Sequence, residues 1–129
     1  MGMVDDRVVL VTGGGGGIGR AASLAFAREG AAHVVVADID PSTAASTVEQ
    51  VEEAGGSASV WEVDVTDEEA VAGMLVEIVD RHGRLDAAFN NAGINHPSTA
   101  LHELDRDSWE EMLASNLTSV FLCMKHELR

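Results

Sequence analysis

The sequence has no tyrosine, a single lysine, a single cysteine and few basic residues of any kind. Without tyrosine, no phenol group in these residues can serve as a general acid or base. The single cysteine, Cys123, cannot form an internal disulfide, which favours a reducing compartment, and we expect a cytoplasmic protein. Eight basic residues stand against 22 acidic ones, so the formal net charge is −14. Such a charge repels nucleic acids and anionic membranes, and we expect neither as a partner.

Long apolar runs and a secretory leader are also missing. No apolar run reaches the length of about 18 residues that a membrane-spanning helix needs. The acidic start, Met1 to Asp6, lacks the basic-then-apolar pattern of a signal peptide. Hydrophobic residues nevertheless make up 46% of the sequence, against 23% charged residues, which excludes wholesale disorder. A length of 129 residues predicts a single domain over residues 1–129.

Short apolar runs alternate with helical patterns along the chain. Each run ends at a glycine, an aspartate or an asparagine, and the runs cover residues 8–11, 34–37, 60–63 and 85–89. These runs are typical of buried strands in a parallel sheet. The strand–helix order, repeated from the first strand onward, predicts an α/β fold with a Rossmann-like doubly wound parallel sheet of about four strands and helices on both faces.

Several residues mark where helices begin and end. Asp40 and Pro41 are typical of an N-cap and first helical residue, and Gly55 of a helix end. Thr66 and Glu69 match a capping box before a helix that ends at Gly83. Two predicted helices carry apolar faces. The helix after the glycine-rich segment has Ile18, Ala21, Ala22, Ala25 and Phe26 on one face, and the helix that ends at Gly83 has Ala70, Val71, Met74, Leu75, Ile78 and Val79.

The segment from Asp105 to Arg129 is predicted to be helical, with a further apolar stripe. This stripe contains Leu113, Leu117, Val120, Phe121, Met124 and Leu128. The sequence stops one residue after the stripe, without a glycine or proline stop signal. We therefore expect the chain to be part of something longer.

A glycine-rich loop follows the first predicted strand and precedes the first predicted helix. Its glycines, within Gly13 to Gly19, let the backbone turn sharply and approach a pyrophosphate closely. The amides and the dipole at the start of the following helix would then hold the negative charge. A flexible linker is the alternative interpretation, but the strand before the loop and the helix after it favour a phosphate-binding loop.

Two acidic residues at the ends of the next strands complete a dinucleotide pattern. Asp38 lies 19 residues after Gly19, where a carboxylate can accept hydrogen bonds from both hydroxyls of a ribose. It would repel a 2′-phosphate, and no arginine or lysine lies in the glycine loop or just after Asp38, so the sequence favours NAD(H) over NADP(H). Helix capping is the alternative role. Asp64 and Val65 could hold the adenine, or could simply form a turn.

Three ordered motifs resemble the short-chain dehydrogenase/reductase family. They are Thr12-Gly-x-x-x-Gly17-Ile18-Gly19, Asn90-Asn91-Ala92-Gly93 and the helical asparagine Asn116. The resemblance implies hydride transfer between a nicotinamide cofactor and an alcohol or carbonyl compound. It also implies a catalytic role for Asn116. The expected cofactor-binding residues are Thr12, Gly13, Gly17, Ile18, Gly19, Asp38, Asp64, Val65, Asn90, Ala92 and Gly93. No metal ligands are expected.

The sequence departs from this family where proton transfer is concerned. The family's serine and its Tyr-x-x-x-Lys motif lie beyond the helix at which this sequence stops, and Lys125 does not match the family lysine. The resemblance therefore covers the front half, about four of seven expected strands. We expect the NAD-binding portion of an oxidoreductase that is catalytically incomplete as these 129 residues. A non-catalytic dinucleotide-binding or assembly module, truncated or vestigial, is the alternative.

The same reasoning predicts the partners of the chain. A fourth strand without a neighbour would leave an open edge, and the last helix would expose its apolar stripe. We therefore expect a homo-oligomer that forms through the fourth strand and the last helix. NAD(H) is expected to bind weakly, roughly in the millimolar range, because only the adenosine and pyrophosphate contacts are present and the net charge opposes an anion.

Overall fold

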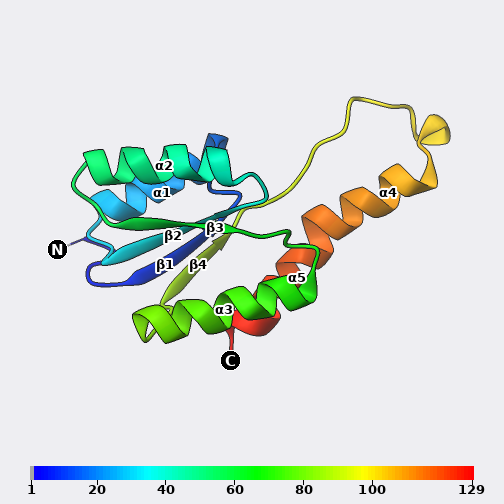
Figure 1. Ribbon diagram of the computed structural model, residues 1–129. Coiled ribbons are helices and arrows are strands. Elements are labelled where there is room, and N and C mark those ends of the chain that lie inside the picture. The colour runs from blue at the N-terminus through cyan, green and yellow to red at the C-terminus, as the bar shows by residue number, and fades with distance from the viewer. Residues whose placement is uncertain (1) are drawn as a thin grey trace.

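A four-stranded parallel sheet lies between two layers of helices in the computed structural model, which describes residues 2–129 (Figure 1). The strands follow the order β3-β2-β1-β4, and all three pairings are parallel. The predicted α/β fold is therefore confirmed. The elements of this body are β1 (Val8–Thr12), α1 (Gly17–Arg28), β2 (His33–Asp38), α2 (Pro41–Glu53), β3 (Ala58–Glu62), α3 (Glu68–His82) and β4 (Ala87–Asn90).

Strand β1 forms the centre of the core. All five of its residues are buried, because β2 and β4 flank it and helices cover both faces. Successive side chains of a strand point to opposite faces. Val8 and Leu10 accordingly pack toward α3, and Val9 and Val11 toward the α1–α2 layer.

Helix α1 packs through different residues from those the sequence pattern indicated. Its buried positions are Gly19 and Ser23, whereas Ile18, Ala21 and Ala25 are exposed. The reason is close packing at its first turn, since a Cβ at Gly19 would collide with the carbonyl oxygen of Gly13. The helix therefore approaches β1 through its small residues. The predicted apolar face of this helix was wrong in these positions.

The caps of α2 and α3 give one confirmed prediction and one correction. Asp40 caps α2, accepting from the amides of Ser42 and Thr43, with Pro41 in the first turn. The predicted capping box of Thr66 and Glu69 is wrong, because Asp67 caps α3 by accepting from Ala70 N. Thr66 is bound instead to the preceding turn, where its amide and hydroxyl both donate to Asp64 Oδ1.

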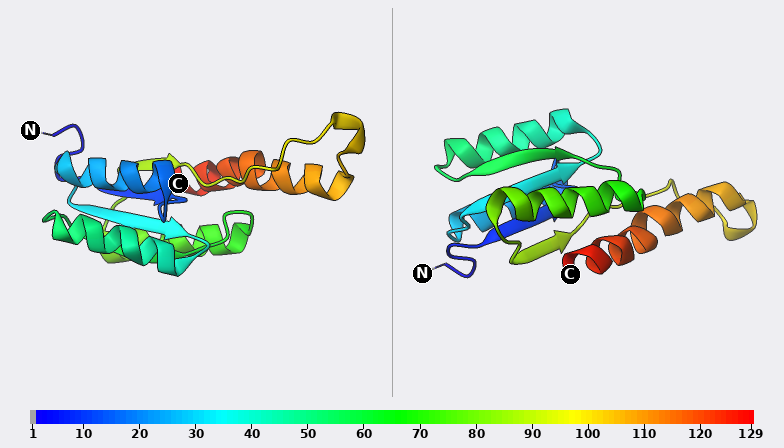
Figure 2. Two further views of the ribbon diagram at one scale, coloured as in Figure 1. Left: turned by 90° about the horizontal axis from the view of Figure 1, so that it is seen from above. Right: turned by 60° about the horizontal axis from the view of Figure 1, so that its bottom comes forward.

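Residues 91–118 leave the body as an arm and return as α5 along the sheet (Figures 1 and 2). The arm contains a 3₁₀ turn η1 (Leu101–Glu103), α4 (Arg106–Leu113) and a π-helical turn η2 (Ala114–Thr118), and it continues into α5 (Ser119–Glu127). The predicted helix over residues 105–129 is thus confirmed, with a π-helical turn in its middle. Helix α5 shares the lower face of the sheet with α3 (Figure 1).

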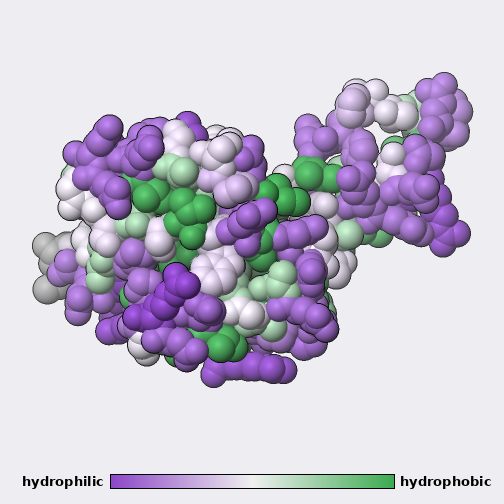
Figure 3. Space-filling model, viewed as in Figure 1, coloured by the Kyte–Doolittle hydropathy of each residue, from purple (hydrophilic) through white to green (hydrophobic). Residues whose placement is uncertain are grey.

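Most of the apolar stripe of this last helical segment is exposed. We call Leu113, Leu117, Phe121, Met124 and Leu128 the arm stripe; each is between 37% and 82% exposed. Helix α5 instead buries Leu122 and Cys123 against the body. Apolar atoms also gather where the arm leaves the body in the view of Figure 3. No helix within residues 2–129 is long and apolar enough to cross a membrane.

Candidate functional site

A cleft of about 330 Å³ opens at the carboxyl ends of the strands, where four loops meet. In open parallel sheets this edge is where ligands bind. The cleft contains six of the predicted cofactor-binding residues, namely Gly13, Asp38, Asp64, Val65, Ala92 and Gly93. Its other lining residues are Gly16, Ile39, Val63, Thr66, Asn91, Ile94 and Ser115. Side chains and backbone far apart in the sequence are therefore brought together at one place.

The glycine loop closes one side of this cleft and leads into α1. Gly13 and Gly17 have φ values of +63° and +51°, a region that residues with a Cβ rarely adopt. The N-cap of α1 is Gly16, which offers no side-chain hydrogen bond to the first amides of the helix. Those amides therefore have no internal acceptor and, together with the helix dipole, can bind a negatively charged group.

The carboxylate of Asp38 is held at the mouth of the cleft by the backbone. Its Oδ2 accepts from Gly15 N at 2.9 Å, and its Oδ1 accepts from Asp40 N at 3.0 Å. Because Asp40 caps α2, the alternative that Asp38 is merely the helix cap does not hold. A carboxylate has about four acceptor positions, so both oxygens can still receive further hydrogen bonds from a ligand.

Asp64 and Val65 lie opposite the glycine loop, in the turn between β3 and α3. Asp64 Oδ1 accepts from both the amide and the hydroxyl of Thr66, at 2.9 and 2.7 Å. Asp64 therefore forms a turn with Thr66 and also lines the cleft. This turn gives the cleft a wall with one exposed carboxylate and one half-buried apolar side chain.

Arg20 is a residue of this region that sequence reasoning did not single out. Its Nη2 donates to Gly15 O at 2.6 Å and its Nε to Thr47 Oγ1 at 3.1 Å. Thr47 Oγ1 in turn donates to Gly14 O at 2.8 Å. The i, i+4 spacing of Thr43 and Thr47 on α2 indicates a shared helix face, but nothing in the sequence shows that this face meets the glycine loop.

Thr12 joins the glycine loop to the segment after β4 and does not line the cleft. Its Oγ1 accepts from the amides of Asn91 and Ala92 at 3.0 and 3.1 Å. Asn91 Nδ2 donates to Thr12 O and Gly13 O, both at 3.3 Å. Thr12 and Asn91 thus fix the relative position of two cleft walls, and Asn91 was not among the predicted site residues.

Asn90, another predicted cofactor-binding residue, lies away from the cleft on the side of α5. Its Nδ2 donates to Glu127 Oε2 at 2.9 Å. Burial raises the pKa of the Glu127 carboxyl above its ordinary value of 4.5, an effect that the hydrogen bond from Asn90 partly opposes. In this structure the Asn90 side chain therefore connects β4 to the last helix.

Asn116 lies in the π-helical turn and binds the loop that follows β4. Its Oδ1 accepts from Ile94 N at 2.7 Å, and its Nδ2 donates to Ile94 O at 2.9 Å. A Cβ on Gly93 would lie 2.7 Å from Asn116 Oδ1, so the loop passes close to this amide. π-Helical turns are rare and occur often at functional sites. Asn116 fixes one wall of the cleft, and its neighbour Ser115 lines it.

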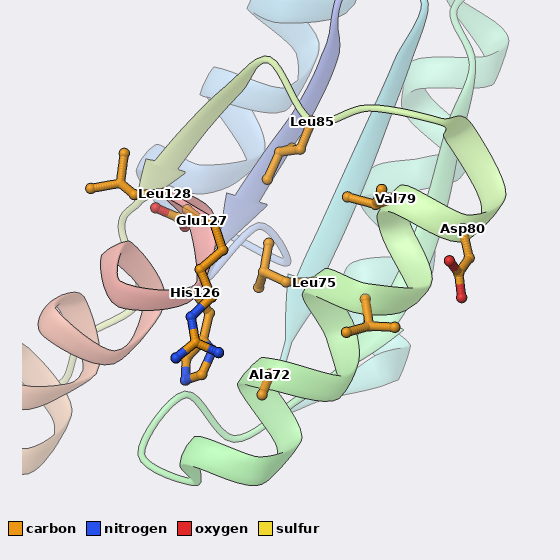
Figure 4. Close-up of a pocket in the computed structure, with 10 residues that line it drawn as sticks. Ala72, Leu75, Val79, Asp80, Leu85, His126, Glu127 and Leu128 are labelled. Atoms are coloured by element: carbon orange, nitrogen blue, oxygen red, sulfur yellow. The ribbon is translucent and has the colours of Figure 1, made fainter.

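A larger cavity, of about 660 Å³, lies between α3 and the end of α5, on the lower face of the sheet (Figure 4). Apolar side chains such as Leu75, Val79 and Leu85 line much of it, and the glycine loop contributes nothing to it. Nearby, Lys125 and His126 both contact Glu68 Oε1, at 2.6 and 3.0 Å, and attach α5 to α3. Its polar lining residues are Asp80, His126, Glu127 and Arg129, and none of the predicted site residues lines it.

Cys123 and the histidines offer no separate reactive centre. Burial raises the pKa of the Cys123 thiol to about 11, so it remains protonated near neutral pH. The reactive form of cysteine is the thiolate. Within residues 2–129 no three His, Cys, Asp or Glu side chains are grouped to hold a metal ion.

Comparison with known proteins gives a consistent result along the whole chain. The family model for short chain dehydrogenase matches residues 7–129. A 3beta-hydroxysteroid dehydrogenase from Mediterraneibacter gnavus is 40% identical over 129 residues, which is 100% of this chain and 46% of that protein. The chain thus spans about half the length of this relative.

Solved structures agree with this family result. A carveol dehydrogenase from Mycobacterium avium in complex with NAD superimposes with a TM-score of 0.92 at 28% identity, covering 99% of this chain and 50% of that one. A metagenomic short-chain oxidoreductase in complex with NADP gives a TM-score of 0.90 at 28% identity, covering 95% and 55%. Both similar structures hold a nicotinamide dinucleotide.

Proposed function

This chain belongs to the short-chain dehydrogenase family, and from that premise we propose that it is the NAD-binding portion of an oxidoreductase acting on an alcohol or carbonyl compound. The observation that carries the proposal is the convergence of the glycine loop, Asp38, Asp64 and the segment Asn91–Gly93 on one cleft. Residues 1–129 would form a single partial dinucleotide-binding domain. When bound, the nicotinamide cofactor supplies the hydride chemistry.

The cleft residues divide the dinucleotide among them. The uncapped start of α1, with Gly17 and the 72% exposed Ile18, would receive the pyrophosphate. Asp38 would accept from the ribose hydroxyls. Asp64 and Val65 would hold the adenine, with the carboxylate accepting from its amino group and the Val65 amide donating to a ring nitrogen.

The preference for NAD over NADP rests on charge. The Asp38 carboxylate is fixed by two backbone amides. It would lie beside the 2′-phosphate of NADP and would repel it, because both groups are negatively charged. Similar structures hold either cofactor, so the fold itself allows both. The identity of residue 38 therefore decides the choice in this proposal.

These 129 residues do not contain all the groups that proton transfer to a substrate requires in this family. The sequence has no tyrosine, and its one lysine, Lys125, is paired with Glu68. General acid–base catalysis typically contributes about 10²–10⁴ in rate, so we propose that these residues alone have no useful dehydrogenase activity. Asn116 is in this view a positioning residue for the cleft wall, through its two hydrogen bonds to Ile94.

Association of chains follows from two exposed features. Strand β4 pairs only with β1 among the described residues, and the arm stripe is exposed. We propose that copies of this chain associate through this edge and stripe. Neither a nucleic acid nor a membrane is proposed as a partner, and a cytoplasmic location is proposed from the cysteine content.

Calorimetric titration with NAD⁺ and NADP⁺ tests the cofactor assignment. We expect a dissociation constant for NAD⁺ in roughly the millimolar range, about tenfold weaker binding by Asp38→Ala, and a smaller effect of that substitution on NADP⁺. Asp107→Ala, at an exposed position of α4, makes the same change in charge far from the cleft and serves as the control. Equal binding by the parent chain and Asp38→Ala would remove the ribose role. Binding of neither cofactor by the parent chain would remove the proposed function.

A further inference from the structure

Two successive carbonyls of the glycine loop are bound from the side opposite the cleft. Gly14 O accepts from Thr47 Oγ1 at 2.8 Å, and Gly15 O accepts from Arg20 Nη2 at 2.6 Å. Arg20 Nε also donates to Thr47 Oγ1 at 3.1 Å, which joins the two contacts. We call Arg20 and Thr47 the loop clamp. It connects α1 and α2 to the glycine loop that precedes α1.

The clamp reaches Asp38 through a single residue, Gly15. Gly15 donates its amide to Asp38 Oδ2 at 2.9 Å and offers its carbonyl to Arg20. The surroundings are tight, because a Cβ at Gly15 would lie 2.8 Å from both Asp38 Oδ2 and Thr43 Cβ. Gly15 is therefore held between the carboxylate and α2, and a shift of its carbonyl would also move its amide relative to Asp38.

The charge of Arg20 strengthens this connection. A hydrogen bond from a guanidinium is charge-assisted and is shorter and stronger than a neutral one. Hydrogen bonds in a chain polarise one another. Such a chain runs from Arg20 Nε to Thr47 Oγ1 and on to Gly14 O, which shares a peptide unit with the Gly15 amide that donates to Asp38.

We propose that Arg20 is a positioning residue that fixes Asp38 for the ribose and thereby maintains the preference for NAD. The proposal rests on the proposed function. It also explains how a basic residue can directly follow the loop without favouring a 2′-phosphate. Arg20 Nε and Nη2 are committed to Thr47 and Gly15, so the guanidinium supports the carboxylate that repels this phosphate.

Titration of clamp variants with NAD⁺ and NADP⁺ tests the proposal. We expect Arg20→Ala to weaken NAD⁺ binding about tenfold and NADP⁺ binding less than about threefold, because NADP⁺ makes no favourable use of Asp38. Arg20→Lys keeps the charge and should recover part of the loss. Thr47→Val preserves the shape but removes the hydroxyl, and should weaken NAD⁺ binding a few-fold. Arg28→Ala, in the exposed last turn of α1, removes the same charge and is the matched control.

A change in the ratio of the two affinities separates positioning from general support of the fold. Equal loss for both cofactors in Arg20→Ala, or behaviour identical to Arg28→Ala, would overturn the clamp proposal while leaving the proposed function intact. Thermal unfolding of each variant shows whether it remains folded.

Exchange of the Gly15 amide proton provides a readout without cofactor. The account predicts faster exchange in Arg20→Ala than in Arg28→Ala, and unchanged exchange would overturn the clamp. If the parent chain binds neither cofactor, the proposed function fails, and this exchange measurement still decides whether Arg20 holds Gly15 on Asp38.

Discussion

Helix α3 and the last helical segment carry similar apolar stripes but use them in opposite ways. In α3, Val71, Met74, Leu75 and Ile78 are all at most 5% exposed, because the helix lies on the face of the sheet formed by β1 and β2. In the arm stripe, every member is at least 37% exposed. Helical periodicity thus indicates that a helix has an apolar face, but it does not indicate what that face contacts.

The largest expected effect comes from truncating the same residue type in both helices. Met74 is fully buried and Met124 is 48% exposed. Met74→Ala should lower the free energy of unfolding by about 2–5 kcal/mol, because it leaves a cavity in the core. Met124→Ala should change it by about 0.5 kcal/mol or less. Urea unfolding of the two variants measures both values, and equal losses would mean that the arm stripe is covered in solution.

Association of the chain is the next largest test. We expect the parent chain to sediment as a dimer or larger at micromolar concentration, and Phe121→Asp to weaken that association at least about tenfold, since a charge would enter the apolar contact. Val76→Asp, at a 60% exposed position of α3, is the control for an added charge. A parent chain that remains monomeric under these conditions would contradict the proposed association.

The junction between the arm and the body gives a smaller effect. Asn116→Ala removes both hydrogen bonds to Ile94 and should lower the free energy of unfolding by about 1–2 kcal/mol. The Ile94 amide should exchange faster with solvent in this variant. Asn95→Ala, at an exposed position in the same loop, is the matched control. Identical exchange of Ile94 in the two variants would show that Asn116 does not hold the loop.

The smallest expected effects are opposite changes of stability with pH in the two regions. In the body, burial and, to a smaller extent, the charge of the neighbouring His82 lower the pKa of His33 below 6.5. The unfolded chain then binds protons more readily than the folded one. Stability from this group is present above pH 6.5 and is lost as the pH falls through the lowered value. His33→Gln should reduce this acid-side loss, measured by urea unfolding at a series of pH values.

Glu127 in the last helix should show the reverse dependence. Burial raises its pKa above 4.5, so the folded chain binds the proton more tightly. Stability from this group is present below pH 4.5 and is lost as the pH rises through the raised value. Glu127→Gln should reduce that loss in the same measurement. A parallel change in both variants would show that these two groups do not set the pH dependence.

Much of the body could be predicted from the sequence because its signals are local. The glycines with positive φ, the strand end at Asp38 and the cap at Asp40 each follow from the conformation or chemistry of one residue. The cleft gathers half of the predicted site because parallel strands end at one edge.

The missed features depend on contacts between distant segments. Arg20 and Thr47 meet only because α1 and α2 pack side by side, and Asn91 reaches Thr12 across 79 positions of sequence. The apolar face of α1 was misplaced because close glycine packing, rather than side-chain hydrophobicity, determines its orientation. The side chain of Asn90 contacts α5, and no periodicity of β4 indicates that neighbour.

Amide hydrogen exchange with and without NAD⁺ tests most directly the claim that the body is a nucleotide-binding unit and the arm stripe is a contact surface. The account predicts slower exchange on adding NAD⁺ at residues 13–19, 38–40, 64–66 and 91–94, and no change along α5. Protection by NAD⁺ that appears along α5, or is absent from the glycine loop, would contradict it.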